Sequence, residues 1–115
     1  MPTVNMLPAS INTQNPTLIA FEYKQELIAA GNGDWIIIPD EIQNISVTAQ
    51  ASGGATARVE TVTDPISDVA NNIVTPVIWD AGEVTLAVSD TAFPCTAIRL
   101  VQTNAGSSKL TVRAQ

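Results

Sequence analysis

The strongest constraint on the fold is a strict alternation of apolar and polar side chains over residues 45–51. The apolar members are Ile45, Val47, Ala49 and Ala51, and the polar residues between them are Ser46, Thr48 and Gln50. A period of two places the apolar side chains on one face of an extended strand and the polar ones on the other. The sequence therefore predicts a strand in a sheet that covers one side of a core.

A glycine-bearing connection, Ser52-Gly53-Gly54, follows this strand, and a second β-rich run continues over residues 55–62. Glycine supplies the positive φ that a tight connection needs, so the pattern predicts a hairpin. The core face of the return strand is expected to hold Ala57, Val59 and Thr61. Its other face, which we expect to be wet, holds Arg58, Glu60 and Val62.

A second hairpin is predicted near the C-terminus, where the runs 97–103 and 109–113 flank Asn104-Ala105-Gly106-Ser107-Ser108. The side chains expected in the core are Ile98, Leu100, Leu110 and Val112. Those expected outside are Arg99, Thr111 and Arg113. Opposed pairs of this kind stabilise neighbouring strands.

Shorter runs complete the pattern. Residues 35–38, 77–79 and 84–88 are β-rich and bounded by proline or glycine turns. Residues 18–23 fit a strand, although the spacing of Leu18, Phe21 and Ile28 before Gly31 also fits a short helix, and both readings stay open. A chain of 115 residues suits one domain. We predict an all-β fold, a single β-sandwich of about seven to eight mainly antiparallel strands with an extended N-terminal arm.

Residues 1–16 differ from the rest because they contain three prolines and no charge. This composition favours extended backbone, so we predict an N-terminal arm over 1–16 and a β-sandwich domain over 17–115. The arm carries four large apolar side chains that need a partner and are the candidate interface: Val4, Met6, Leu7 and Ile11. Docking on a neighbouring subunit and folding back as an edge strand of its own domain both remain open.

The charge content favours protein partners over nucleic acid. Only 14% of residues are charged, against about 25% in an average soluble domain. A neutral surface is poorly protected against association, which suits an assembly component. The net charge of −6 repels nucleic acid, so no such partner is expected. Eleven acids and two bases lie in residues 22–90, whereas residues 91–115 hold three bases and no acid. This polarity either orients neighbours or reflects solvated loops.

The sequence lacks the residues of most catalytic schemes, so we expect no enzyme and no cofactor. It contains no histidine, which is the commonest general base and a common metal ligand. The lone Cys95 has no activating base, and its apolar neighbours favour a small core residue. The carboxylate pairs Asp40/Glu41 and Asp64/Asp68 lack calcium-loop spacing, so no metal site is expected. Nucleotide-binding and acyl-transfer motifs are absent as well.

Three aromatic residues, Tyr23, Trp35 and Trp79, suit either a sugar-stacking platform or core anchors, and the apolar context of the tryptophans favours the core. No run is long and apolar enough to span a membrane, and the N-terminus lacks a signal-peptide pattern. We therefore expect no membrane partner and synthesis in a cytoplasm.

Residues 35–115 resemble small β-sandwich virion proteins of tailed bacteriophages, of the head decoration or cement type. The resemblance rests on Trp35-Ile36-Ile37-Ile38-Pro39, Thr56-Ala57-Arg58-Val59-Glu60 with Asp64-Pro65, Trp79-Asp80-Ala81-Gly82-Glu83-Val84, and Thr96-Ala97-Ile98-Arg99-Leu100 with Gly106-Ser107. Residues 1–16 lie outside it.

This resemblance implies a non-enzymatic protein that coats an assembled capsid. The implied partners are copies of itself, with trimers as one arrangement, and the major capsid protein or other virion subunits. The implied location is the virion, after synthesis in the host cytoplasm. The alternative is a tail, neck or fibre component of the virion, including one that contacts a glycan on the host surface.

Overall fold

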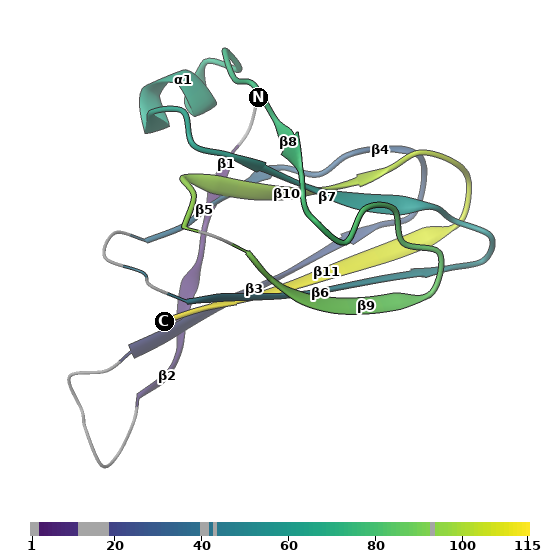
Figure 1. Cartoon of the computed structure of the whole chain (residues 1–115), viewed down its shortest axis with the longest axis horizontal. Helices are drawn as coiled ribbons and strands as arrows, with labels where there is room; N and C mark the ends of the chain where they lie inside the picture. Colours follow the sequence, from purple (N-terminus) through teal and green to yellow (C-terminus); the bar gives the residue numbers. More distant parts are fainter. Residues whose placement is uncertain (1–2, 12–18, 40–41, 43, 93) are drawn as a thin grey trace.

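The computed structural model describes residues 3–11, 19–39, 42, 44–92 and 94–115, except for the side chains of residues 7–11, 19 and 20. Two sheets pack face to face, and one short helix lies outside them (Figure 1). The all-β sandwich predicted from the alternating pattern is confirmed.

The first sheet, called sheet A, has the strand order β1-β5-β10-β7-β8, and β4 also pairs with β10. The strands are β1 (Thr3–Asn5), β4 (Gly31–Asn32), β5 (Trp35–Ile37), β7 (Ala57–Val62), β8 (Val77–Ile78) and β10 (Ala97–Gln102). β1 runs parallel to β5, and the other pairs of this sheet are antiparallel. The helix α1 (Ile66–Ala70) lies in the connection between β7 and β8.

The second sheet, called sheet B, has the order β2-β3-β11-β6-β9, and all of its described pairs are antiparallel. The strands are β2 (Leu7–Ile11), β3 (Ile19–Leu27), β6 (Ile45–Ser52), β9 (Ala87–Ala92) and β11 (Ser107–Ala114). The described chain thus has eleven strands where seven or eight were expected. The additional ones are β1, β2 and β4, and the region left open between strand and helix is β3.

Both predicted hairpins are in fact connections between the two sheets. β6 pairs with β11 and β9 in sheet B, whereas β7 lies in sheet A. β10 and β11 are divided between the sheets in the same way. A glycine turn shows that the chain reverses, but it does not show whether the two arms hydrogen-bond or pack face to face. Here the two strands of each pair lie in different sheets. The apolar face of the first strand packs against the apolar face of the second across the core, and both apolar faces are thereby buried.

The two connections lie together at one end of the sandwich, at the right of Figure 1. Asn104 Nδ2 donates a hydrogen bond of 2.9 Å to the Gly54 carbonyl, and the Ser52 and Ser107 hydroxyls are 2.8 Å apart. Gly106 has φ of 125°, and a Cβ there would lie 2.7 Å from the Ser52 carbonyl oxygen. Close approach of two backbones therefore requires glycine at this position.

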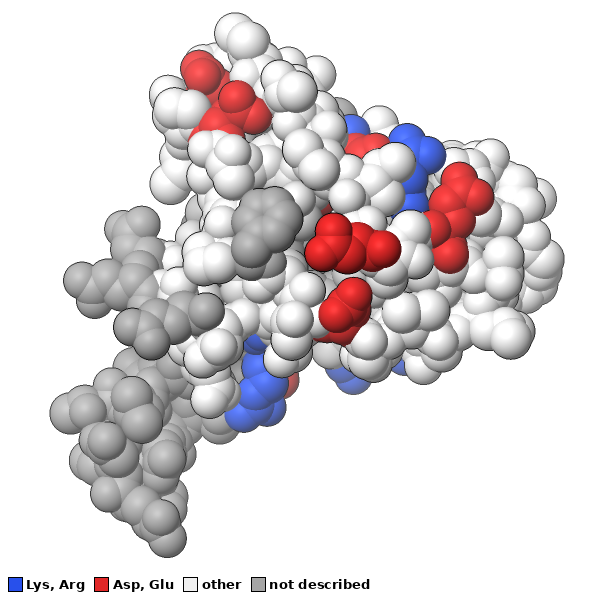
Figure 2. Space-filling view, viewed as in Figure 1, with Lys and Arg blue, Asp and Glu red and all other residues white. Residues whose placement is uncertain are grey.

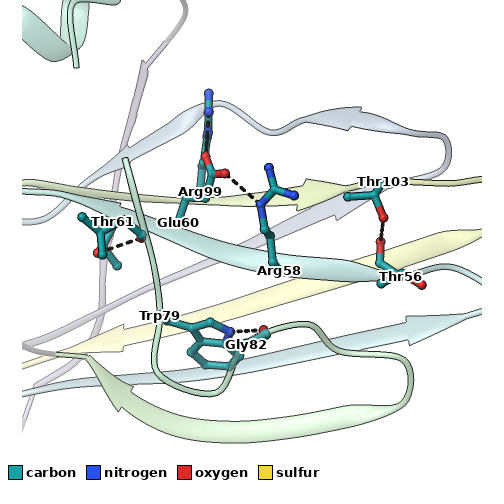
Figure 3. A network of polar contacts seen from close by, with 9 residues as sticks. Thr56, Arg58, Glu60, Thr61, Trp79, Gly82, Arg99 and Thr103 are labelled. Atoms are coloured by element: carbon teal, nitrogen blue, oxygen red, sulfur yellow. Dashed lines mark hydrogen bonds and ion pairs between the residues drawn. The ribbon is translucent and has the colours of Figure 1, made fainter. Parts of the chain in front are cut away.

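The main core fills the space between the sheets. Sheet A contributes Ile98 and Leu100, and sheet B contributes Leu110 and Val112, which confirms the four core residues predicted near the C-terminus. The alternating run of β6 is confirmed as well, because its apolar members are buried and its polar ones face outward. Trp79 also packs into this core, and its indole N–H donates to the Gly82 carbonyl at 2.7 Å (Figure 3).

The expectation of a wet outer face on sheet A is wrong. Glu60, Val62 and Arg99 are 6%, 1% and 8% exposed, although their strand positions point away from the main core. Residues 66–78, which we call the outer segment, fold back over this face. Val69 of α1 packs there with Trp35, Val62 and Ala97 in a second apolar cluster. Period-two alternation cannot reveal such a cover, because the covering residues lie elsewhere in the chain.

Candidate interaction surfaces

The N-terminal candidate interface lies along one side of the sandwich. β1 forms an edge of sheet A, and β2 forms an edge of sheet B. Met6, between the two strands, is 5% exposed and belongs to the main core, and Val4 packs against that core. The side chains of Leu7 and Ile11 lie outside the described set. Residues 3–11 therefore pair with their own domain, and a contact of these residues with a neighbour stays a prediction.

The outer segment carries most of the exposed aliphatic surface. Six large aliphatic side chains of the described residues are exposed, and four of them lie in this segment. Their exposed fractions are 52% for Ile66, 67% for Ile73, 54% for Val77 and 49% for Ile78. Exposed aliphatic groups that are concentrated in one segment make that segment a candidate interaction site.

Several contacts hold the outer segment in place. Val69 is fully buried against sheet A, and the Thr75 N–H donates a hydrogen bond of 3.0 Å to the Asp64 carboxylate. The Thr61 hydroxyl donates to the Val77 carbonyl at 3.3 Å, next to the pairing of β7 with β8. The exposed aliphatic groups therefore stand on an anchored backbone. Sequence reasoning missed this surface because residues 66–78 show no period-two alternation.

The other two exposed aliphatic residues border a groove of about 510 Å³ at the end of sheet B. Ile28, which follows β3, is 87% exposed, and Leu86, which precedes β9, is 79% exposed. Strand order places them on opposite sides of β11 and β6, which supply much of the groove lining. Lys109 of β11 and Glu26 of β3 add one charge of each sign. We call this the sheet B groove.

The basic residues are unevenly distributed over the molecule. Three of the five, Lys24, Lys109 and Arg113, lie on the outer face of sheet B, as the strand registers show. With Glu22 and Glu26, the net charge of this face is three minus two, or +1, in a chain of net charge −6. Elsewhere acidic groups prevail, and Figure 2 shows carboxylates spread over the face in view. The molecule therefore has a weakly basic sheet face and acidic surroundings.

The remaining two basic residues bind a single carboxylate on the outer face of sheet A (Figure 3). Arg99 donates two hydrogen bonds to Glu60 Oε1, at 3.0 Å from Nε and 2.7 Å from Nη2. Arg58 Nε donates to Glu60 Oε2 at 2.9 Å. The Arg99 guanidinium also lies 4.3 Å from the centre of the Trp35 ring, a cation–π arrangement.

Burial alone would raise the pKa of the Glu60 carboxyl, but the hydrogen bonds and charges of Arg99 and Arg58 outweigh that effect. The pKa of Glu60 therefore lies below its ordinary value. The group is ionised near neutral pH, and both of its oxygens are engaged. Such an arrangement holds both arginine side chains against the outer face of sheet A, with Arg99 also on the Trp35 ring. The buried indole N–H of Trp35 has no hydrogen-bond partner in the described part of the chain.

The other residues singled out for chemistry are dispersed. Cys95 is half buried, and burial raises its pKa to about 11, as its apolar neighbourhood predicted. Asp64 accepts the Thr75 hydrogen bond, and Asp40 and Glu41 lie outside the described residues. Within the described residues, no three acidic, cysteine or histidine side chains gather as a metal site would require. Trp35 and Trp79 are both buried, so their rings form no exposed stacking platform.

The sheet edges are built against strand addition. β8 has two residues, and β2 contains Pro8 and an irregular register. β9 is longer, but Asp90 places a charged, partly exposed residue on this edge strand, opposite the core residue Val47. Short edges, proline, bulges and charged side chains are the devices that discourage edge-to-edge pairing. Side-chain surfaces are therefore the better candidates for association. No helix of the described residues has the length and apolar character of a membrane span.

No protein-family model and no curated protein matches this sequence. Among solved structures, it is similar to a chain of the disulfide-linked pili of Bacillus endospore appendages, at 14% identity and a TM-score of 0.41, covering 84% of this chain and 88% of that one. It is also similar to Peruvianin-I, a cysteine peptidase from Thevetia peruviana latex, at 12% identity and a TM-score of 0.42, covering 94% and 66%. An oxalate oxidase matches at 13% identity and 0.40, covering 83% and 41%. Likenesses this weak carry no argument about function.

Proposed function

We propose that this protein is a non-enzymatic structural protein of a bacteriophage particle, a decoration or cement protein that binds the assembled head shell. The observation that carries the proposal is the placement of the exposed aliphatic groups. They are concentrated in the outer segment, which hydrogen bonds and Val69 hold against sheet A, and at the borders of the sheet B groove. The resemblance of residues 35–115 to phage virion proteins supplies the setting.

The physical role of such a protein is to add buried interface to a shell. Fully burying one aliphatic side chain contributes ~1.5–3 kcal/mol, so the outer segment alone offers a substantial association energy. A ligand that binds only the assembled shell stabilises it by mass action. Many copies acting together offset the outward pressure of packed DNA without any chemical step. The low charge of the surface reduces the desolvation cost of such contacts.

The proposal is tested with particles that lack the protein. Adding the purified chain should fill a fixed number of sites per shell and raise the temperature at which the shell releases its DNA. A double variant, Ile73→Ser with Val77→Ser, should occupy shells at least about tenfold less well at equal concentration. Thr91→Ser, an exposed change on β9 outside the outer segment and the groove lining, is the matched control and should bind like the original.

The copy number in native particles separates the head from other locations. Hundreds of copies indicate a shell coat, whereas a small multiple of three, six or twelve indicates a neck, tail or fibre component. Failure of the original chain to bind shells at any concentration, together with a low copy number, would exclude the decoration role.

A further inference from the structure

The outer segment and the sheet B groove cannot satisfy one another within a single molecule. In Figure 1 the helix of the outer segment lies at the upper left, whereas the connections that adjoin the groove, at Ser52 and Ser107, lie at the right. Each surface leaves large aliphatic groups in water. The outer segment presents its aliphatic groups on α1 and the residues that follow it. The sheet B groove lies between Ile28 and Leu86.

The two surfaces match in apolar character. The walls of the groove, Ile28 and Leu86, offer aliphatic contact on both sides. Ile73 of the outer segment is an exposed group of the same chemical kind. Seating it between the walls would remove exposed aliphatic surface from both partners.

The charge of the outer segment is opposite in sign to that of the sheet B face beside the groove. The outer segment and the residues that flank it carry acids, Asp64, Asp68 and Asp80, and no base. The groove lining holds one charge of each sign, Lys109 and Glu26, and it adjoins the outer face of sheet B, whose net charge is +1. An acidic projection is therefore drawn to the weakly basic region of this molecule and away from the rest of its surface.

We propose that the outer segment of one copy docks in the sheet B groove of a second copy, in a head-to-tail contact. This inference rests on the proposed function for its setting in a particle, but the contact itself involves only this chain. On a shell, Ile73 would contact a neighbouring copy, so the loss of shell occupancy expected for Ile73→Ser with Val77→Ser would come from the loss of contact between copies. Because the two surfaces differ, the contact is heterologous, and its repetition closes into a ring or continues as an open chain. A ring of three is one closed solution. The second copy is the occupant that the charges favour, since both complementary surfaces lie on this chain.

The contact is tested in solution, without shells, by analytical ultracentrifugation over a series of concentrations. The original chain should form oligomers that dissociate on dilution. Ile73→Ser in the outer segment and Leu86→Ser in the groove should each weaken association about tenfold or more. Both positions are exposed, so the melting temperature should not change. Thr91→Ser should associate like the original.

An equal mixture of the two variants gives the sharpest readout. The Ile73→Ser copy keeps an intact groove and the Leu86→Ser copy keeps an intact outer segment, so the mixture should recover one contact and form one-to-one dimers. Loss of association only on Ile73→Ser would show that outer segments pair with each other. Loss only on Leu86→Ser would show that grooves do so, and either result would overturn the proposal.

A chain that stays monomeric up to about 1 mM, which corresponds to a very weak contact, would also overturn the inference. The outcome is independent of shell binding. Shells that bind a chain monomeric in solution would leave the proposed function standing and remove the head-to-tail contact. Oligomers that form in solution but do not bind shells would support the head-to-tail contact and contradict the proposed function.

Discussion

The two outer faces of the sandwich are completed in different ways. On sheet A, the outer segment covers Trp35 and Val62, and the ion pairs of Glu60 are buried beside them. On sheet B, the outward side chains are serine, threonine, glutamine and charged groups, and no described segment covers them. A β-strand that alternates polar and apolar residues can therefore have either a solvated or a buried second face. The difference depends on whether another part of the chain reaches it.

Deletion of residues 1–11 should have the largest effect, because it acts on both sheets at once. It removes the edge strands β1 and β2 and the buried Met6, whose truncation alone would cost ~2–5 kcal/mol. We expect a large fall in melting temperature or failure to fold. Thermal unfolding followed by circular dichroism measures this. Unchanged stability with weakened shell binding would instead support docking of this segment on a neighbour.

The substitution Glu60→Gln should act on sheet A alone. It removes the carboxylate that accepts two hydrogen bonds from the buried Arg99 guanidinium, and breaking a buried pair costs ~3–5 kcal/mol. The matched change is Glu22→Gln on sheet B, where Glu22 and Arg113 are half exposed and 3.9 Å apart. An exposed pair contributes only ~0–1 kcal/mol. Urea unfolding of the two variants compares the faces directly, and equal losses would contradict the distinction between them.

Val69→Ala should loosen the cover of sheet A. Val69 is the buried residue of α1, and losing two buried methyl groups costs ~2 kcal/mol including the cavity. Ile73→Ala, in the same segment but exposed, should change the free energy of unfolding by less than about 0.5 kcal/mol. Hydrogen exchange of residues 66–78 should accelerate only in Val69→Ala. Faster exchange in both variants would show that the exposed Ile73 also holds the segment against sheet A, and would contradict the prediction.

Acidification should destabilise the sheet A side through Glu60. Its pKa in the folded chain lies below the ordinary value of ~4.3, so its contribution is complete above that value and is lost as the pH falls through the folded pKa. Unfolding free energies measured between about pH 6 and 3 should fall more steeply for the original chain than for Glu60→Gln. Parallel curves would show that other carboxyl groups cause the acid response.

The smallest effect is expected on the bare face of sheet B. Thr48→Val removes an exposed hydrogen bond to Ser89, whose oxygen lies 2.8 Å away. Exposed changes of this kind shift stability by about 0.5 kcal/mol or less, and valine also favours a strand. Urea unfolding should therefore show almost no difference. A loss above ~1 kcal/mol would contradict the solvated character of this face.

Much of the fold followed from the alternation of side chains. The buried faces of β6, β10 and β11 were all predicted, since a period of two reports directly which side chains share a face. The sequence did not predict which strands pair with each other. Gly53 and Gly106 mark places where the chain reverses, but a glycine turn of this kind occurs both in a hairpin within one sheet and in a connection between two sheets.

The candidate surfaces were less accessible to sequence reasoning. The N-terminal residues attracted attention because they are apolar and uncharged, yet Met6 lies in the core of its own chain. Ile28 and Leu86 are separated by more than half of the described chain. They border the same groove only because the strand order places them on either side of β11 and β6. In the outer segment, Ile73 and Val77 had no periodic pattern to mark them.

By itself, the sequence determined that this chain forms a β-sandwich and lacks the histidine on which many catalytic schemes depend, because local alternation and composition are properties of the residues alone. Only the tertiary structure decided which sheet each strand joins and which outer face is covered. It also decided where Arg99 lies, a residue expected in solvent and found buried against Glu60 and Trp35. The reason is physical: burial depends on what packs against a side chain, and the residues that cover sheet A come from a segment whose own pattern does not indicate where it folds.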